Sequence, residues 1–265
     1  MQNRIEKKFK ELKKRKKKAF IAFITAGDPN LGMTEKFVLG FEKAGVHIVE
    51  LGVPFSDPLA DGPTIQASSQ RALERSKVTL NKILSLVSRI RRKSQIPIAL
   101  MTYYNPVFHL GEEEFIIKAK QSGVDGIIVP DLPPEEATVL IKTAKKNHLA
   151  TVFFLSPTTT KERMKKIIQA SSGFIYYVSL TGVTGVRRSL PVDIVKNVRL
   201  AKRYTTKPIC VGFGVSTKSQ VKAIAKIADG VIVGSAIVNE IAKNSGKKDI
   251  VKRVSSFVLR LAKNL

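Results

Sequence analysis

Short apolar runs alternate with longer amphipathic segments along the whole chain. The short runs are almost continuously apolar and rich in Val, Ile and Phe, as in parallel strands that are covered on both faces. They are residues 20–25, 47–51, 98–102, 126–129, 151–155, 174–179, 209–212 and 231–233. Eight such runs predict the strands of a parallel sheet.

The segments between these strands have the spacing of amphipathic helices. Examples are residues 112–121, 134–146, 161–171, 192–202 and 218–227, and Ser216 or Thr217 is expected to cap the last of them. No linker rich in Pro, Gly or Ser interrupts the alternation, so we predict an α/β fold, a single (β/α)8 TIM barrel over residues 1–265. A doubly wound open sheet is the alternative, but no GxGxxG turn supports it.

Three segments lie outside the repeat. Ile5, Phe9 and Leu12 recur at helical spacing among lysines, which predicts an extra helix across the bottom of the barrel. A long segment rich in Pro, Asp and Ser, residues 52–64, follows the second strand, and residues 180–191 form a second long loop after the sixth. Long loops at the C-terminal ends of barrel strands usually carry function.

The charge of the chain is strongly positive, with 46 Lys and Arg against 21 Asp and Glu. The first 18 residues contribute +8 of the net +25, so most of the excess is spread over the rest of the chain. A basic surface attracts nucleic acid, anionic lipid or phosphorylated metabolites. The basic residues show no aromatic interleaving, so we expect no specific nucleic-acid partner, although a nucleic-acid-binding barrel stays an alternative.

Composition also bears on compartment. No apolar run approaches the roughly 20 residues that span a bilayer, and the basic N-terminus lacks the apolar segment of a signal peptide. Cys210 is the single cysteine, so no internal disulfide can form. We therefore expect no membrane association and a cytoplasmic protein.

Glu50 is the most informative single residue, because it lies inside an apolar strand near the end where barrel active sites are found. Burying a carboxylate is costly and raises its pKa, so such a group can act as general acid and base at neutral pH. The alternative is an outward-facing glutamate paired with a lysine of a helix.

Four aspartates also follow strands: Asp28, Asp57, Asp61 and Asp131. Loop aspartates most often form turns or caps, and Asp61 precedes a glycine as in a typical turn. Each nevertheless falls on the face where a substrate of a barrel enzyme binds.

Glycines after the last three strands indicate a phosphate site. Residues 182–185, 212–216 and 234–235 follow strands six, seven and eight, and the last pair opens a helix. Backbone N–H groups at such turns, together with a helix dipole, bind phosphate in barrel enzymes. Their joint placement favours a phosphorylated small-molecule substrate.

Several absences restrict the chemistry further. None of the eight strand runs contains a lysine, which argues against a Schiff base in the barrel core. The three histidines are too scattered in the sequence to predict a metal site, and Cys210 is interpreted as a core residue. The remaining chemistry is metal-free acid–base catalysis by carboxylates on a phosphate ester.

The segment from Glu50 to Gln66, ELGVPFSDPLADGPTIQ, closely resembles the signature of tryptophan synthase α subunits. The resemblance covers essentially the whole chain in the same order. It is supported by residues 23–29, 101–105, 129–133, 182–185 and 212–214. It implies a carbon–carbon lyase that cleaves indole-3-glycerol phosphate to indole and glyceraldehyde 3-phosphate in tryptophan biosynthesis.

The resemblance also implies roles for individual residues. Glu50 matches the catalytic acid/base residue, Asp61 matches the aspartate that holds the indole N–H, and Tyr176 matches a tyrosine that helps to position the glutamate. The other implied substrate-binding residues are Phe23, Met101, Tyr103, Thr184 and Phe213 around the indole ring, and Gly185, Gly214, Gly234 and Ser235 at the phosphate.

Finally, the resemblance implies a partner, a β subunit that carries pyridoxal phosphate and receives indole in an α2β2 complex. No cofactor is expected in this chain itself. Two alternatives stay open: another phosphate-binding barrel enzyme, which would leave the acidic second loop unexplained, and a non-catalytic subunit that only activates its partner.

Overall fold

A computed structural model describes residues 3–178, 192–212, 214–263 and 265. Within them, nine parallel strands form one sheet in the order β5-β4-β3-β2-β1-β9-β8-β7-β6. The strands are β1 (Ala19–Thr25), β2 (Ile48–Gly52), β3 (Ile98–Met101), β4 (Gly126–Ile128), β5 (Ala150–Val152), β6 (Phe154–Leu155), β7 (Ile175–Val178), β8 (Ile209–Gly212) and β9 (Gly230–Val233).

The two edges of this sheet, β5 and β6, are consecutive in the chain and separated by Phe153 alone, so the sheet curves into a nearly closed barrel. The predicted fold class is confirmed. One detail of the prediction is wrong, because the expected fifth strand, 151–155, is two short strands. β5 pairs with β4 and β6 pairs with β7, and the chain changes partners at Phe153.

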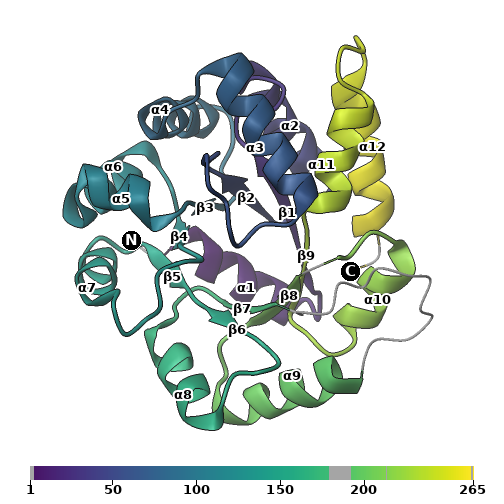
Figure 1. Cartoon of the computed structure of the whole chain (residues 1–265). Coiled ribbons are helices and arrows are strands. Elements are labelled where there is room, and N and C mark those ends of the chain that lie inside the picture. The colour runs from purple at the N-terminus through teal and green to yellow at the C-terminus, as the bar shows by residue number, and fades with distance from the viewer. Residues whose placement is uncertain (1–2, 179–191, 213, 264) are drawn as a thin grey trace.

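Helices surround the strands, as Figure 1 shows. Their bounds are α1 (Arg4–Lys14), α2 (Leu31–Lys43), α3 (Pro63–Ser76), α4 (Leu80–Arg91), α5 (Tyr104–Leu110), α6 (Glu112–Ser122), α7 (Thr138–Lys146), α8 (Lys161–Ala170), α9 (Val192–Tyr204), α10 (Lys218–Ala225), α11 (Ser235–Lys243) and α12 (Ile250–Ala262). None of the helices in the described part of the chain is long and apolar enough to cross a membrane.

Two helix boundaries test the sequence interpretation. Thr217 caps α10: its side chain accepts from the backbone N–H of Gln220, whose own side chain accepts from the backbone N–H of Thr217 in a capping box. α7 begins at Thr138, four residues later than predicted, because the chain first makes a turn in which the Glu136 N–H donates to the carbonyl of Pro133.

The barrel has two apolar layers. Along β2, Val49 and Leu51 pack outward against the helices, whereas Ile48 belongs to the cluster inside the barrel. This alternation follows from the two-residue period of a strand. Every residue of β1 and β2 is buried, as expected for parallel strands covered on both faces.

The extra N-terminal helix is present as predicted. α1, purple in Figure 1, lies across the middle of the barrel and buries Ile5, Phe9 and Leu12 against the inner cluster. The rings of Phe9 and Phe174 have their centroids 5.9 Å apart. α1 therefore closes the N-terminal end of the barrel, and the C-terminal ends of the strands stay available for a site.

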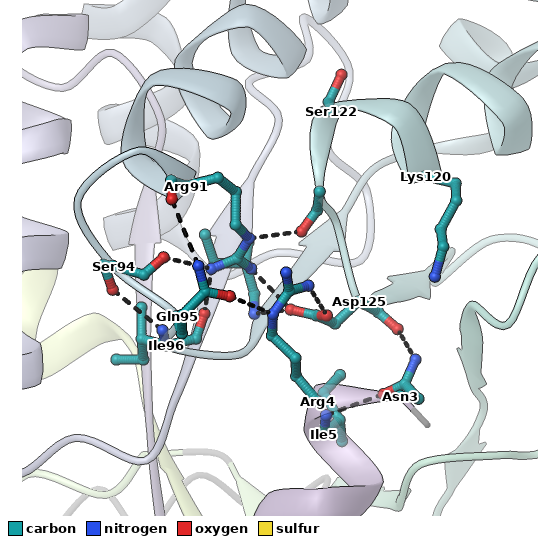
Figure 2. Close-up of polar contacts among 12 residues, drawn as sticks. Asn3, Arg4, Ile5, Arg91, Ser94, Gln95, Ile96, Lys120, Ser122 and Asp125 are labelled. Carbon is teal, nitrogen blue, oxygen red and sulfur yellow. Dashed lines mark hydrogen bonds and ion pairs between the residues drawn. The ribbon is translucent and has the colours of Figure 1, made fainter. Parts of the chain in front are cut away.

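A buried aspartate anchors α1, as Figure 2 shows. Asp125 is 3% exposed and accepts from Arg4 Nη1 at 2.8 Å, from Arg91 Nη2 at 2.7 Å and from the backbone N–H of Ile98 at 2.9 Å. The Asn3 side-chain amide donates to its backbone carbonyl at 2.6 Å. One carboxylate thus joins the N-terminus, α4 and β3.

Asp125→Asn is expected to lower the free energy of unfolding by about 3 kcal/mol, because removing one charge of a buried pair leaves its partner uncompensated. Urea unfolding followed by circular dichroism measures the effect. The matched control is Asp249→Asn, which removes an exposed pair with Arg253 and leaves the unfolding midpoint unchanged. Equal midpoints for all three proteins would show that Asp125 does not anchor the barrel.

Candidate active site

Glu50 faces the inside of the barrel. It lies two residues after Ile48 on β2, and its backbone pairs with Phe23 on β1 and Ala99 on β3. The residue is 0% exposed, and neither carboxyl oxygen has a hydrogen-bond partner among the described residues. The alternative of an outward-facing glutamate paired with lysine is wrong.

This burial controls the protonation of Glu50. Burial first, and then the nearby negative charge of Asp61, raise the pKa of Glu50 from 4.5 to about 8. A carboxyl group in an apolar environment without a donor holds its proton because water no longer stabilises the anion. Glu50 is therefore a protonated acid at neutral pH.

Asp61 lies in the loop after β2 and is half-buried. The Tyr103 hydroxyl donates to Asp61 Oδ2 at 3.0 Å and accepts from the backbone N–H of Ala60 at 3.0 Å. The ring of Phe55 stacks on Tyr103 with centroids 5.2 Å apart. Tyr103 therefore holds the end of this loop against the segment that starts α5.

The two carboxyl groups differ in their environments. Burial raises the pKa of Asp61, but the hydrogen bond from Tyr103 lowers it again, whereas Glu50 has no such donor. The first proton to leave this pair as the pH rises is therefore that of Asp61. Two titratable groups driven apart in this way form an acid and an anion side by side.

A small cavity of about 10 Å³ lies at this end of the barrel. Four predicted site residues line it, Phe23, Asp61, Met101 and Tyr103. Sequence reasoning did not single out the other lining residues, which are Thr25, Gly52, Val53, Ile65 and Ser69. In the sequence, only their position at the end of a strand or in the first turns of α3 could have indicated that they line the site.

Gly52 leaves space for the Phe23 ring because it has no side chain. A Cβ at Gly52 would lie 2.6 Å from Cζ and 2.8 Å from Cε2 of that ring, which is closer than real contacts allow. The glycine directly after Leu51 is thus required by the aromatic side chain on the neighbouring strand.

Tyr176 on β7 packs against the apolar cluster inside the barrel. Burial first, then the charges of Glu50 and Asp61, raise its pKa well above 10, so the phenol keeps its proton. Its ring packs on Phe154 with centroids 4.8 Å apart. A Cβ at Gly212 would lie 2.8 Å from the Tyr176 hydroxyl, so this glycine makes room for the phenol.

The predicted phosphate residues are placed by two strand ends. Gly234 is the N-cap of α11 and Ser235 is its first residue, directly after β9. Gly214 follows β8 with φ +67, a conformation that favours glycine. Thr184 and Gly185, like the rest of the 180–191 loop, lie outside the described residues, and so does Phe213, directly after β8.

Two of the other aspartates have structural partners. Asp131 accepts from the backbone N–H of Tyr104 with both oxygens, at 2.9 and 3.1 Å, and so caps α5. Asp28, 4% exposed, forms a two-point ion pair with Arg71 at 2.6 and 3.1 Å. The prediction of caps and turns therefore describes Asp131, while Asp28 is a buried ion pair.

The remaining candidate ligands lie apart. His47 Nδ1 accepts from the backbone N–H of Phe20, and burial lowers the pKa of His47 to about 4. Cys210 is fully buried in the inner cluster, as its core interpretation predicts. Among the described residues, no three His, Cys, Asp or Glu side chains form a group that would hold a metal ion.

The fold and the site define a (β/α)8 barrel with a buried carboxyl group, Glu50, and a second carboxyl group, Asp61, toward the C-terminal ends of its strands. The family model described as tryptophan synthase alpha chain matches residues 9–265. This chain belongs to that family. It is a carbon–carbon lyase of tryptophan biosynthesis, which cleaves indole-3-glycerol phosphate to indole and glyceraldehyde 3-phosphate.

Individual relatives support the assignment. The tryptophan synthase alpha chain of Geotalea daltonii is 52% identical over 258 residues, 97% of either chain. The crystal structure of subunit alpha from Legionella pneumophila has a TM-score of 0.91 and 36% identity, with 99% of this chain and 98% of that chain covered. An a2b2 complex from Pyrococcus furiosus matches at 41% identity and a TM-score of 0.86, covering 92% and 97%.

Tyr103→Phe is expected to lower kcat/KM about tenfold, because a hydrogen bond to a charged group contributes roughly 1.5–3 kcal/mol and part of it is replaced by water. Loss of the donor raises the pKa of Asp61, so the acid limb of the pH–rate profile moves to higher pH. Tyr104→Phe is the control, since Tyr104 donates to Glu112. Unchanged profiles in both variants would show that Tyr103 does not tune Asp61.

The raised pKa of Glu50 predicts a pH dependence of stability. Between pH 4.5 and about 8 the folded protein holds a proton that the unfolded chain releases. Stability therefore falls as pH rises through this window, by up to about 1.4 kcal/mol per pH unit. Glu50→Gln lacks this slope. Urea unfolding of both proteins from pH 5 to 9 measures the difference, and parallel curves would contradict the burial of a neutral acid.

Proposed function

We propose that Glu50 and Asp61 carry out the cleavage of indole-3-glycerol phosphate in this chain. The observation that supports the proposal is the buried carboxyl of Glu50, without a hydrogen-bond partner in the described chain and with a pKa raised to about 8. An acid with a pKa near the working pH both gives and takes a proton readily.

A single carboxyl group, that of Glu50, serves as both the acid and the base, so no proton is gained or lost over the reaction. Protonated Glu50 gives its proton to C3 of the indole, and the ring electrons that form the new bond leave a positive charge at the ring nitrogen. The resulting carboxylate then takes the proton of the C3′ hydroxyl. The O–H electrons form the aldehyde, the C3–C3′ bond breaks, and its electrons return to the ring. Glu50 ends protonated, ready for the next substrate.

Asp61 stabilises the charged intermediate. Its carboxylate accepts from the indole N–H and lies opposite the positive charge that develops on the ring. The Tyr103 hydroxyl supports this role because it donates to Asp61 Oδ2 and favours the anion. Tyr176, whose phenol keeps its proton, is by family resemblance the residue that helps to position Glu50 when substrate is bound.

The indole ring binds among Phe23, Met101 and Tyr103, which line the small cavity. A volume of about 10 Å³ holds roughly one water, so these side chains must move to admit a bicyclic ring. Met101 is unbranched and adapts easily, and it is half-buried here. By family resemblance, Thr184 and Phe213 complete the indole pocket.

The phosphate binds at Gly214, Gly234 and Ser235, with Gly185 contributing by family resemblance. The first N–H groups of α11 have no partner within the helix, and the helix dipole favours an anion there. A single barrel domain over residues 1–265 is part of this proposal, supported by the one sheet that runs through the described residues.

A β subunit is the proposed partner, as in the a2b2 complex of Pyrococcus furiosus. By family resemblance, this β subunit carries pyridoxal phosphate. Leu59 is 92% exposed in the loop that carries Asp61, and Phe108 is 69% exposed on the helix that Tyr103 precedes. We propose that the partner covers these two apolar side chains. The compartment that we propose is the cytoplasm, and we propose no nucleic-acid or membrane partner.

The test is indole release from indole-3-glycerol phosphate by the purified chain, with and without the β subunit of a related complex. Glu50→Gln is expected to lower kcat by about 10²–10⁴-fold, the usual contribution of general acid–base catalysis. Addition of the β subunit is expected to raise the wild-type rate. Circular dichroism checks that the variant is folded.

Two outcomes would contradict the proposal. Equal rates for wild type and Glu50→Gln would remove Glu50 from the chemistry. A wild-type chain that releases no indole even in the complex, but accelerates the β subunit, would show a non-catalytic activating subunit instead.

A further inference from the structure

A much larger cavity lies at the opposite end of the barrel. Its volume is about 810 Å³, it is open to solvent, and it is lined by α1, the end of α7, the segment between α8 and β7, and the turn before β8. These segments meet at the N-terminal ends of the strands, whereas Glu50 and Asp61 lie toward the C-terminal ends. The cavity is separate from the proposed catalytic site.

Four lysines line this cavity. Lys10 and Lys13 come from α1 and Lys145 from α7, and none of the three has an ion-pair partner among the described residues. Lys207 precedes β8, and its ammonium donates to the carbonyls of Ile168 and Ser171 at 2.6 and 2.7 Å. Four ammonium groups from three separate segments therefore surround one space.

The C-terminal ends of helices offset part of the positive charge of these lysines. α7 and α8 both end at the cavity, and each helix C-terminus carries about half a negative charge. Lys145 lies in the last turn of α7, and Lys207 caps the last carbonyls of α8. Lys13 likewise lies in the last turn of α1. Subtracting these three helix ends and the lining Glu6 from four lysines leaves an excess of roughly one and a half positive charges. This excess favours the binding of an anion.

The walls of the cavity are apolar as well as basic. Phe9, Ile141, Leu149 and Pro208 line it together with the lysines. Small-molecule sites have this combination, a concave apolar surface of about 300–1,000 Å³ with a few polar groups that orient the ligand. The cavity thus fits a ligand that has an apolar body and charged ends.

We propose that this cavity binds an organic anion, a compact ring system that carries a phosphate or carboxylate groups. The ring packs against Phe9 and Leu149, and the anionic group lies among the lysines of α1 and α7. Such a ligand bridges α1 to α7 and the barrel wall. By mass action it stabilises the folded chain, by an amount that rises with the logarithm of its concentration once that concentration exceeds Kd.

The experiment uses 1-naphthyl phosphate as the probe, titrated calorimetrically into the full chain at about 0.15 M salt, where exposed charges act over only about 8 Å. The catalytic site also accepts a phosphate ester, so the wild type is expected to bind two equivalents. Competitive inhibition of indole release reports the catalytic equivalent separately.

Two double variants provide a matched comparison. Lys13→Glu with Lys145→Glu reverses two charges that line the cavity. Lys14→Glu with Lys146→Glu reverses their sequence neighbours, which lie in the same last turns of α1 and α7 but do not line it. Both variants change net charge and helix-end electrostatics alike, so they differ only in the cavity.

The cavity variant is expected to bind the second equivalent at least about tenfold more weakly, a loss of roughly 1.4 kcal/mol or more. The control variant keeps both equivalents, and inhibition of cleavage is the same in both. A wild type whose only bound equivalent is the one that inhibits cleavage overturns the proposal. Equal weakening in both variants also overturns it, because the surface charge alone would then explain binding.

Two further probes test the two parts of the ligand. Inorganic phosphate and neutral 1-naphthalenemethanol are both expected to bind at this cavity more weakly than 1-naphthyl phosphate. If either binds as tightly, the requirement for an apolar body joined to an anion is wrong. Thermal unfolding of the ligand-free variants checks that they remain folded.

Discussion

A carboxyl group without a partner inside the barrel is the constraint on which the site depends. Glu50 is held between Phe23 and Ala99 by strand pairing, so its side chain cannot turn outward without moving β2. Burial keeps the group neutral, and the neighbouring charge of Asp61 strengthens this effect. The rest of the site keeps the pKa of Glu50 high relative to that of Asp61, because Tyr103 donates to Asp61 and no described group donates to Glu50.

Much of the fold follows from local sequence. The strands are recognisable because each is apolar on both faces, and α1 because Ile5, Phe9 and Leu12 share one side of a helix. The prediction from sequence failed where strand pairing in the whole sheet, rather than local composition, decides the structure. The run 151–155 is continuous in composition, yet its two halves pair with different neighbours, and that choice depends on how the whole sheet closes.

Part of the site could also be predicted from local sequence, and part could not. The position of Glu50 in an apolar strand indicated an acid, and the glycine after β9 at the start of α11 is visible in the sequence. The Tyr103–Asp61 hydrogen bond joins residues 42 positions apart, and the Asp125 network joins residues up to 122 apart. Such pairings arise from the packed arrangement of the chain, and no spacing rule reports them. The lysine-lined cavity has the same origin, since its walls come from segments that are distant in sequence.

The position of α1 has a consequence for synthesis. The helix is synthesised well before its partners, since its apolar side packs against Phe174 and its anchor is Asp125. During translation Ile5, Phe9 and Leu12 therefore stay without their native cover until about two thirds of the chain has left the ribosome. An uncovered apolar stripe is prone to aggregation. The lysines on the remaining faces of this helix keep the nascent segment hydrated, and their charge makes nascent chains repel one another until the helix packs on the barrel.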